Sequence, residues 1–150
     1  LSKKKRNEYF TGIKQTCDIG EGWVAPHEID RLGLADAMRL AVKRSLSAIV
    51  ASYDEVIIMD GLINYCDKAF YNVSCIPKAD SVEPIVSAAS IAAKVLRDRY
   101  MSKLSKEYPD YFFDRHVGYG TKLHIKTLIH HGPAAVHRFS FKPIQSYAIT

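Results

Sequence analysis

The feature that most constrains the fold is one long helical pattern, which runs from Val82 to about Lys106. Pro84 occupies a first-turn position that favours a helix start. Alanines at positions 88, 89, 92 and 93 leave the helix narrow on several sides. A helix of this kind can approach a neighbouring sheet or helix closely, so we expect it in the interior of the domain.

Two strand patterns precede this helix, and further helical patterns surround them. Val56–Met59 is a short apolar run typical of a buried strand, and Ala69–Ile76 mixes β-branched and aromatic residues. Helical spacing predicts helices over residues 3–16, 34–49 and 121–131, and a short helical turn over 27–33. We expect a short strand or loop at 20–24, an aromatic-rich loop at 111–120 and an extended tail at 136–143. A chain of 150 residues fits a single α/β domain over residues 1–150.

The composition is that of an ordinary soluble protein. The chain is 47% hydrophobic and 25% charged, and no apolar run approaches the roughly 18 residues needed to cross a bilayer. Its three cysteines, Cys17, Cys66 and Cys75, form no CxxC pair, so neither a disulfide framework nor a zinc site is indicated. Without a secretory leader at its start, we expect a cytoplasmic protein that has no membrane partner.

The chain is basic, with a net charge of +5 and a pI of about 9.1. Four cations stand together at Lys3–Arg6, and a second basic set lies between His116 and Arg138. This charge is compatible with a polyanionic partner. The same residues are explained as well by solvated helix surfaces, and both interpretations stay open at this point.

Two aspartates stand where carboxylates can share a cation. Asp60 follows the strand pattern that ends at Met59, and Asp80 stands just before the long helix. A carboxylate at the end of a strand and another at the start of a helix can converge on one ion, and Mg²⁺ prefers such oxygen ligands. The spacing therefore indicates metal-ion chemistry, and two acids alone resemble half of a site.

Motifs along nearly the whole chain resemble the ribonuclease HII (type 2 ribonuclease H) family. The blocks stand in the order seen in that family: Leu1-Ser2-x-Lys4-Lys5-Arg6, Glu28-Ile29-Asp30, Met38, Met59-Asp60-Gly61, Lys78-x-Asp80, the segment Ser87–Met101, Gly118-Tyr119-Gly120-Thr121-Lys122-x-His124 and His137-Arg138-x-Ser140-Phe141-x-Pro143. The last three blocks are the most specific, and an unrelated protein is not expected to carry them in this order.

The resemblance implies a ribonuclease H-like fold, with a mixed central sheet flanked by helices. It also implies an endonuclease that cuts the RNA strand of RNA–DNA hybrids and cuts 5′ to ribonucleotides embedded in duplex DNA, as in ribonucleotide excision repair. The family uses four carboxylates and a divalent metal, Mg²⁺ or Mn²⁺. By resemblance Asp60 and Asp80 are the third and fourth carboxylates, so they are the expected catalytic and metal-binding residues.

The resemblance also implies substrate-binding residues. Tyr119 matches a tyrosine that stacks at the ribose of the RNA–DNA junction, whereas packing on the core is the alternative for a lone tyrosine. Lys4, Lys5 and Arg6 match a basic segment beside the phosphodiester backbone, where contacts supply salt-sensitive affinity. Arg97 and Asp98 are expected in an internal ion pair or a cap rather than in a catalytic element, so Asp98 is not counted among the catalytic acids.

Two departures from the family accompany these matches. The family's first two carboxylates form an Asp-Glu pair on an opening strand, followed by a Gly-Arg-Gly turn, and this sequence contains no such segment. We therefore expect a domain without its N-terminal strands that is inactive in this form and folds poorly or associates, whereas the complete protein would be a monomer. The alternative is a non-catalytic nucleic-acid-binding remnant of the same fold. Ala79 and Gly33 stand where the family usually has glycine and asparagine, and Ala79 is expected to restrict the loop that carries Asp80.

Overall fold

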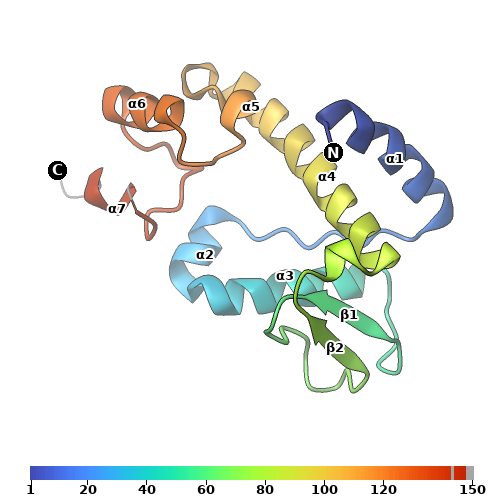
Figure 1. The fold of residues 1–150 in the computed structure, drawn as a ribbon. Coiled ribbons are helices and arrows are strands. Elements are labelled where there is room, and N and C mark those ends of the chain that lie inside the picture. Colours follow the sequence, from blue (N-terminus) through green and yellow to red (C-terminus); the bar gives the residue numbers. More distant parts are fainter. Residues whose placement is uncertain (143, 148–150) are drawn as a thin grey trace.

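The computed structural model describes residues 1–142 and 144–147. Its elements follow in the order α1 (Lys3–Thr16), α2 (Pro26–Leu32), α3 (Leu34–Ala48), β1 (Ile57–Asp60), β2 (Val73–Ile76), the 3₁₀ turn η1 (Ala79–Ser81), α4 (Pro84–Glu107), the 3₁₀ turn η2 (Pro109–Tyr111), α5 (Phe113–His116), α6 (Lys122–His131) and α7 (Ile144–Tyr147) (Figure 1). The chain is mixed α/β, with helices around a small sheet, which confirms the predicted class. No helix in this described part is long and apolar enough to cross a membrane.

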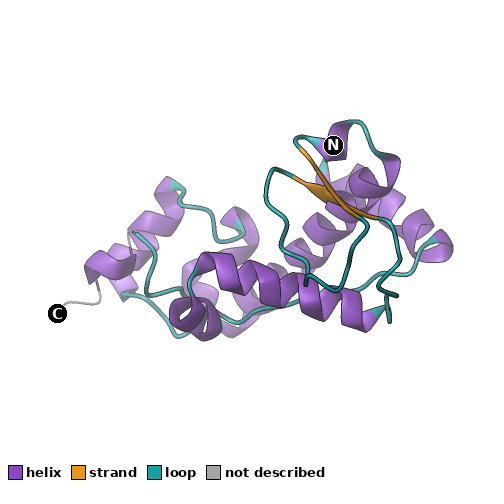
Figure 2. Ribbon diagram, turned by 90° about the horizontal axis from the view of Figure 1, so that it is seen from below, coloured by secondary structure: helices purple, strands orange, loops and turns teal. Residues whose placement is uncertain are grey.

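The sheet consists of β1 and β2, which run parallel. Ile57 lies beside Val73, and Asp60 lies beside Ile76. Both predicted strands are confirmed, although the second is shorter than the predicted range 69–76. Parallel pairing turns the carboxyl ends of both strands to one edge, and the chain continues from that edge into η1 and α4. The sheet lies at one end of the molecule and the C-terminal helices at the other (Figures 1 and 2).

The long helix α4 is confirmed, and it connects the two ends of the molecule (Figure 1). Phe10 of α1 packs against Ala92 and Val95 of α4 in one buried cluster. Ala89 and Ala93 of the same helix are exposed. The prediction that this helix lies in the interior is therefore correct for one face only, within the residues that the structure describes.

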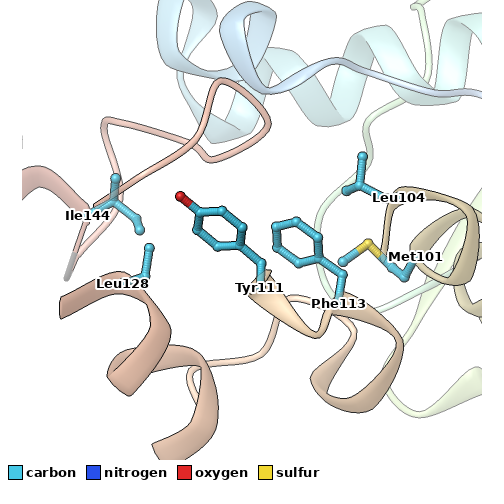
Figure 3. Packing of buried hydrophobic residues seen from close by; sticks show 6 residues of the cluster. All are labelled: Met101, Leu104, Tyr111, Phe113, Leu128 and Ile144. Atoms are coloured by element: carbon cyan, nitrogen blue, oxygen red, sulfur yellow. The ribbon is translucent and has the colours of Figure 1, made fainter. Parts of the chain in front are cut away.

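A second buried cluster closes the far end of α4 (Figure 3). Its members are Met101, Leu104, Tyr111, Phe113, Leu128 and Ile144. The rings of Tyr111 and Phe113 stack, with centroids 5.4 Å apart and planes 7° from parallel. The Tyr111 hydroxyl donates to the carbonyl oxygen of Gly132 at 2.8 Å, which satisfies the polar end of a buried ring. This cluster holds η2, α5, α6 and α7 against α4.

Two C-terminal segments differ from the prediction. Residues 111–120 contain the end of η2 and the helix α5 rather than a loop alone. The tail at 136–142 forms a series of turns rather than an extended chain. It does pack back, because the backbone N–H groups of Phe139 and Ser140 donate to the carboxylate of Asp30 at 2.8 and 2.9 Å. Pro143 lies outside the described residues.

Two glycines let the loop between α1 and α2 pack against α3. A Cβ on Gly20 would lie 2.1 Å from the carbonyl oxygen of Ser45, and one on Gly22 would lie 1.8 Å from that of Ala41. Only a residue without a side chain fits at such distances. Of the two forms predicted for this segment, the loop is the one observed.

The helix α3 has the predicted position but covers little core. Ala37 is its only buried residue, and Leu34 and Met38 on the predicted apolar stripe are exposed. By contrast, α6 begins where its capping residue predicts, because Thr121 Oγ1 accepts from the backbone N–H of His124 at 3.3 Å. Local sequence signals therefore predicted where the helices lie along the chain better than they predicted which helix residues are buried.

Candidate active site

Asp60 ends β1, and one hydrogen bond holds it beside the turn that contains the second aspartate. Its Oδ1 accepts from the backbone N–H of Ala79 at 3.0 Å. Ala79 opens η1 and Asp80 follows it in the chain. The bond therefore connects two segments that are distant in sequence, at the edge where both strands end.

The turn η1 fixes the backbone that carries Asp80. Lys78 adopts the left-handed conformation, with φ 59° and ψ 33°, and Ala79 after it is completely buried. The Ser87 hydroxyl donates to the carbonyl oxygen of Asp80, and the Ser81 hydroxyl donates to its carboxylate at 3.4 Å. The positive φ falls on Lys78 and not on Ala79. The alanine at position 79 therefore introduces no backbone strain, and a restriction of the loop that carries Asp80 stays a prediction.

The two carboxylates suit a hard divalent cation. Carboxylate oxygens are the ligands that Mg²⁺ and Mn²⁺ prefer, and Asp60 is exposed while Asp80 is half-buried. Within the described residues, no group of three or more His, Cys, Asp or Glu side chains could hold a metal ion. The pair therefore fits such a metal in kind but supplies only part of a coordination shell.

Tyr119 lies in the turn between α5 and α6, with a side chain that is 74% exposed. This exposure excludes the alternative in which the ring packs on the core. Together with Trp23 and Arg138, Tyr119 lines a groove of about 810 Å³, and neither Asp60 nor Asp80 is among the residues that line it.

The structure thus separates Tyr119 from the aspartates. Arg97 of α4 donates to the carbonyl oxygen of Val117 at 3.4 Å, beside the turn that carries Tyr119. Arg97 lies near the middle of this helix, whereas Asp80 precedes its N-terminus. The stretch of α4 from Pro84 to Arg97 rises about 20 Å, which sets the scale of the separation along this helix.

The predicted basic segment divides into two parts. Arg6 Nη2 forms an ion pair with Asp98 Oδ2 of α4 at 3.0 Å, and its Nη1 donates to the carbonyl oxygen of Leu1 at 2.9 Å. This pair confirms the ionic role predicted for Asp98 and gives Arg6 a role in packing. Arg97, which was predicted with Asp98, instead donates to the carbonyl oxygen of Val117. Lys4 and Lys5 are exposed. Cations in the first turn of a helix are unfavourable for the helix dipole, so helix stability does not explain these lysines.

Three histidines from the predicted basic set are not on the surface. His116, His124 and His137 are 4%, 7% and 6% exposed, so the prediction of a solvated or polyanion-binding face is wrong for them. One signal points to this result: His124 stands four residues before Leu128 and therefore shares its face of α6, and Leu128 is buried.

Known proteins resemble this chain along most of its length. A sequence model of ribonuclease HII matches residues 1–144. The chain belongs to the ribonuclease HII family. Ribonuclease HII of Shewanella loihica is 40% identical over 147 residues, which cover 97% of this chain and 70% of that protein. The enzyme of Pseudothermotoga lettingae is 37% identical over 97% of this chain and 63% of its own length, and that of Bacillus licheniformis is 35% identical over 98% and 56%.

Membership makes this chain part of an enzyme family of hydrolases named for ribonuclease activity. Asp60, Asp80 and Tyr119 all lie inside the matched residues 1–144. The mixed α/β structure, with its small parallel sheet flanked by helices, is consistent with a ribonuclease H-like fold. The chain spans between 56% and 70% of the length of these three relatives.

Proposed function

We propose that this protein hydrolyses the RNA strand of RNA–DNA hybrids, and cuts 5′ to ribonucleotides embedded in duplex DNA, with Asp60 and Asp80 as metal ligands. The observation that carries this proposal is the hydrogen bond from the Ala79 N–H to Asp60. In a member of the ribonuclease HII family, that bond holds the strand end that carries Asp60 against the turn that carries Asp80.

The proposed cofactor is Mg²⁺ or Mn²⁺. When bound, such a metal activates water for attack on phosphorus and stabilises the leaving 3′ oxygen. The role of Asp60 and Asp80 is to hold and orient the ion at the edge of the sheet. Oδ1 of Asp60 accepts a hydrogen bond from the N–H of Ala79. Oδ2 forms no hydrogen bond within the described residues, so it can bind a metal ion without losing one.

Substrate contacts are assigned to the exposed residues. Tyr119 presents a free ring to the ribose, where the 2′-hydroxyl distinguishes RNA from DNA. Lys4 and Lys5 contact phosphates, which provides affinity without sequence preference. Arg6 acts mainly through Asp98, and it supports the helix that carries the two lysines. The three cysteines are free thiols, which suits a reducing cytoplasm. There the activity would serve ribonucleotide excision repair, and the complete protein would act as a monomer.

A second candidate function is binding without cleavage. Two carboxylates give a metal ion few protein ligands, and the described residues offer no third member for the cluster. The groove beside Tyr119 also carries Arg97, Tyr100 and Arg138, and cations interleaved with aromatic rings suit nucleic acid. On either account we expect this chain by itself to be much less active than a protein with four metal-binding carboxylates.

The test is cleavage of a DNA duplex that carries one ribonucleotide, in Mg²⁺ and in Mn²⁺, with an all-DNA duplex as control. Asp60→Asn is the matched variant, because asparagine keeps an oxygen that accepts from Ala79 but removes the charge that holds the metal. Cleavage 5′ to the ribonucleotide that disappears in Asp60→Asn supports the enzyme. Binding that weakens with salt, without cleavage in either metal, supports the second candidate. The absence of both cleavage and binding would refute both candidate functions.

A further inference from the structure

Three buried histidines lie together beneath the turn that carries Tyr119. His116 comes from α5, His124 from α6 and His137 from the C-terminal tail. The rings of His116 and His124 stack with centroids 4.2 Å apart and planes 10° from parallel. His124 Nε2 and His137 Nε2 are 3.2 Å apart. We call these three residues the histidine cluster.

The hydrogen bonds around His124 and His137 assign the position of each ring proton. His124 Nδ1 is 3.0 Å from the carbonyl oxygen of Tyr119, which can only accept, so the proton of the neutral ring lies on Nδ1 and its Nε2 is an acceptor. Nε2 of His137 then carries the proton and donates to Nε2 of His124. His137 Nδ1 lies 3.0 Å from the backbone nitrogen of Ala134 and 3.1 Å from its carbonyl oxygen, and with the proton on Nε2 it accepts from the N–H. The result is one directed chain of hydrogen bonds that ends at Tyr119.

His116 holds the same turn from its other side. Its Nδ1 accepts from the backbone N–H of Gly118 at 3.1 Å, and its Nε2 donates to the carbonyl oxygen of Tyr111 at 2.7 Å. Gly118 has φ +84°, and a Cβ there would lie 3.0 Å from Nη2 of Arg97. The cluster therefore bonds to the backbone at 118 and at 119, the two positions that orient an otherwise exposed ring.

We propose that the histidine cluster positions Tyr119, and that it does so only while its rings are neutral. A proton added to Nε2 of His124 would point at the donor of His137 and break the chain of hydrogen bonds. For substrate recognition this inference rests on the role proposed above for Tyr119. These histidines are positioning residues, because they are buried beneath the turn and would act on substrate only through it.

The surroundings of the cluster oppose protonation. The groups that face it are Tyr111 from η2, Arg97 from α4 and the three histidines themselves. No ion pair joins any of these rings to a carboxylate within the described residues. Burial lowers the pKa of His124 and of His137 below the ordinary value of 6.5, and His116 lowers both further. The backbone of Tyr119 and of Ala134, beside the two Nδ1 atoms, opposes this shift without reversing it.

Two substitutions at His124 separate positioning from general stability. His124→Asn places its amide N–H near the position of Nδ1 and keeps the donor to Tyr119. His124→Gln places its amide near the position of Nε2 and loses that donor. The full chain, labelled at histidine nitrogen and at tyrosine, is titrated by NMR, with Tyr119→Phe used to assign the Tyr119 signal.

We expect the His124 proton on Nδ1 and a Tyr119 signal that shifts as the cluster titrates below pH 6.5. His124→Asn should keep the Tyr119 signal of the parent chain, and His124→Gln should change it. His137→Asn, which keeps the acceptor for Ala134 and loses the donor to His124, gives a second comparison if His124→Gln unfolds. A proton on Nε2 of His124, or a Tyr119 signal that is the same in all these variants, would overturn the inference.

Duplex binding then separates this inference from the proposed function. Preference for a duplex with one ribonucleotide over an all-DNA duplex should fall about two- to tenfold in His124→Gln, the effect of one hydrogen bond, and not in His124→Asn. If the NMR coupling is present and the parent chain shows no preference, the role of Tyr119 in substrate recognition fails and the positioning stands. If the preference is present without the coupling, the positioning fails and the proposed function stands.

Discussion

At the scale of single residues, backbone conformation decides how the two aspartates meet. Lys78 carries the left-handed conformation before η1, and the buried Ala79 supplies the N–H that Asp60 accepts. A non-glycine residue in that conformation costs roughly 1 kcal/mol or more. This conformation turns the chain so that η1, which contains Asp80, lies against Asp60 at the end of β1.

Substitutions at these two neighbours should have opposite effects. Lys78→Gly is expected to stabilise the fold by up to about 1 kcal/mol, since glycine adopts positive φ without penalty. Ala79→Gly is expected to destabilise it by about 1 kcal/mol, since it removes a buried methyl group and adds freedom to the unfolded chain. Urea unfolding of the two variants checks this. Greater loss of stability in Lys78→Gly than in Ala79→Gly would contradict the conformation of η1.

At the scale of elements, close approach and charge determine which helices touch. The loop before α2 reaches the backbone of α3 through Gly20 and Gly22. The helices α1 and α4 contact each other through the apolar side chain of Phe10 and through the ion pair of Arg6 and Asp98. Each contact joins segments that local sequence patterns cannot associate.

A glycine pair tests the contact with α3. Gly22→Ala should destabilise the chain by several kcal/mol, because its Cβ would lie 1.8 Å from the carbonyl oxygen of Ala41. Gly12→Ala is the matched control, since nothing lies within 4 Å of its Cβ inside helix α1, and it should stabilise by roughly 0.5–1 kcal/mol. Thermal unfolding of both variants gives the answer. Equal unfolding midpoints for Gly22→Ala and Gly12→Ala would mean that the loop does not closely contact the backbone of α3.

The ion pair between α1 and α4 makes a prediction that distinguishes Arg6 from its lysine neighbours. Arg6→Met should lower stability by about 1–2 kcal/mol, because it leaves the mostly buried carboxylate of Asp98 without its partner. It should change the salt dependence of duplex binding little. Lys4→Gln should do the reverse and reduce the slope of affinity with salt by about one contact. If Arg6→Met instead reduced the salt dependence of duplex affinity and left stability unchanged, Arg6 would contact the substrate rather than support the fold.

At the scale of the whole molecule, buried bases and paired acids make stability depend on pH. His124 and His137 have a pKa below 6.5 when folded, so the unfolded chain binds more protons as the pH falls below 6.5. Hydrogen bonds from the Arg44 side chain and from the Ala25 N–H to the Glu28 carboxylate lower its pKa from 4.5 to about 2. The unfolded chain therefore again binds more protons than the folded chain below pH 4.5. Both effects remove stability on acidification.

Unfolding midpoints should therefore be highest above pH 6.5 and fall in two stages, below 6.5 and again below 4.5. Glu28→Gln should remove part of the second stage and leave the first. The measurement is urea unfolding between pH 8 and pH 3 in a constant ionic strength. A midpoint that rises as the pH falls from 7 to 5 would contradict the burial of neutral histidines.

Exposed apolar surface around the sheet predicts association. Both edges of the two-stranded sheet are unpaired within the described residues, and Val50, Leu62, Tyr71 and Val82 are 67–88% exposed. Surfaces of this kind favour contact between copies. We expect the sedimentation coefficient to rise with concentration, and less so in Leu62→Lys, whose site is open to solvent. A monomer at all concentrations with one cooperative unfolding transition would show that this surface is tolerated.

Much of the local structure was predictable because its causes are local. The apolar spacing in α1 and α6, the capping hydroxyl of Thr121, and the strand pattern before Asp60 all act within a few residues. The motifs likewise predicted the family, since motif order is a property of the chain alone. The burial of α3 was not predictable, because an apolar stripe does not say whether another element covers it.

The sequence by itself determined the order of the longer helices and the two strands, the family, and the placement of Asp60 at the end of a strand and of Asp80 shortly before the long helix. Only the tertiary structure decided which groups face each other. It paired Arg6 with Asp98 and buried three histidines beneath Tyr119. It also placed the turn of Tyr119 beside the middle of α4 and the aspartates near its N-terminus. The physical reason is that hydrogen bonding, burial and charge pairing depend on distances in space, which residue spacing along a chain does not specify.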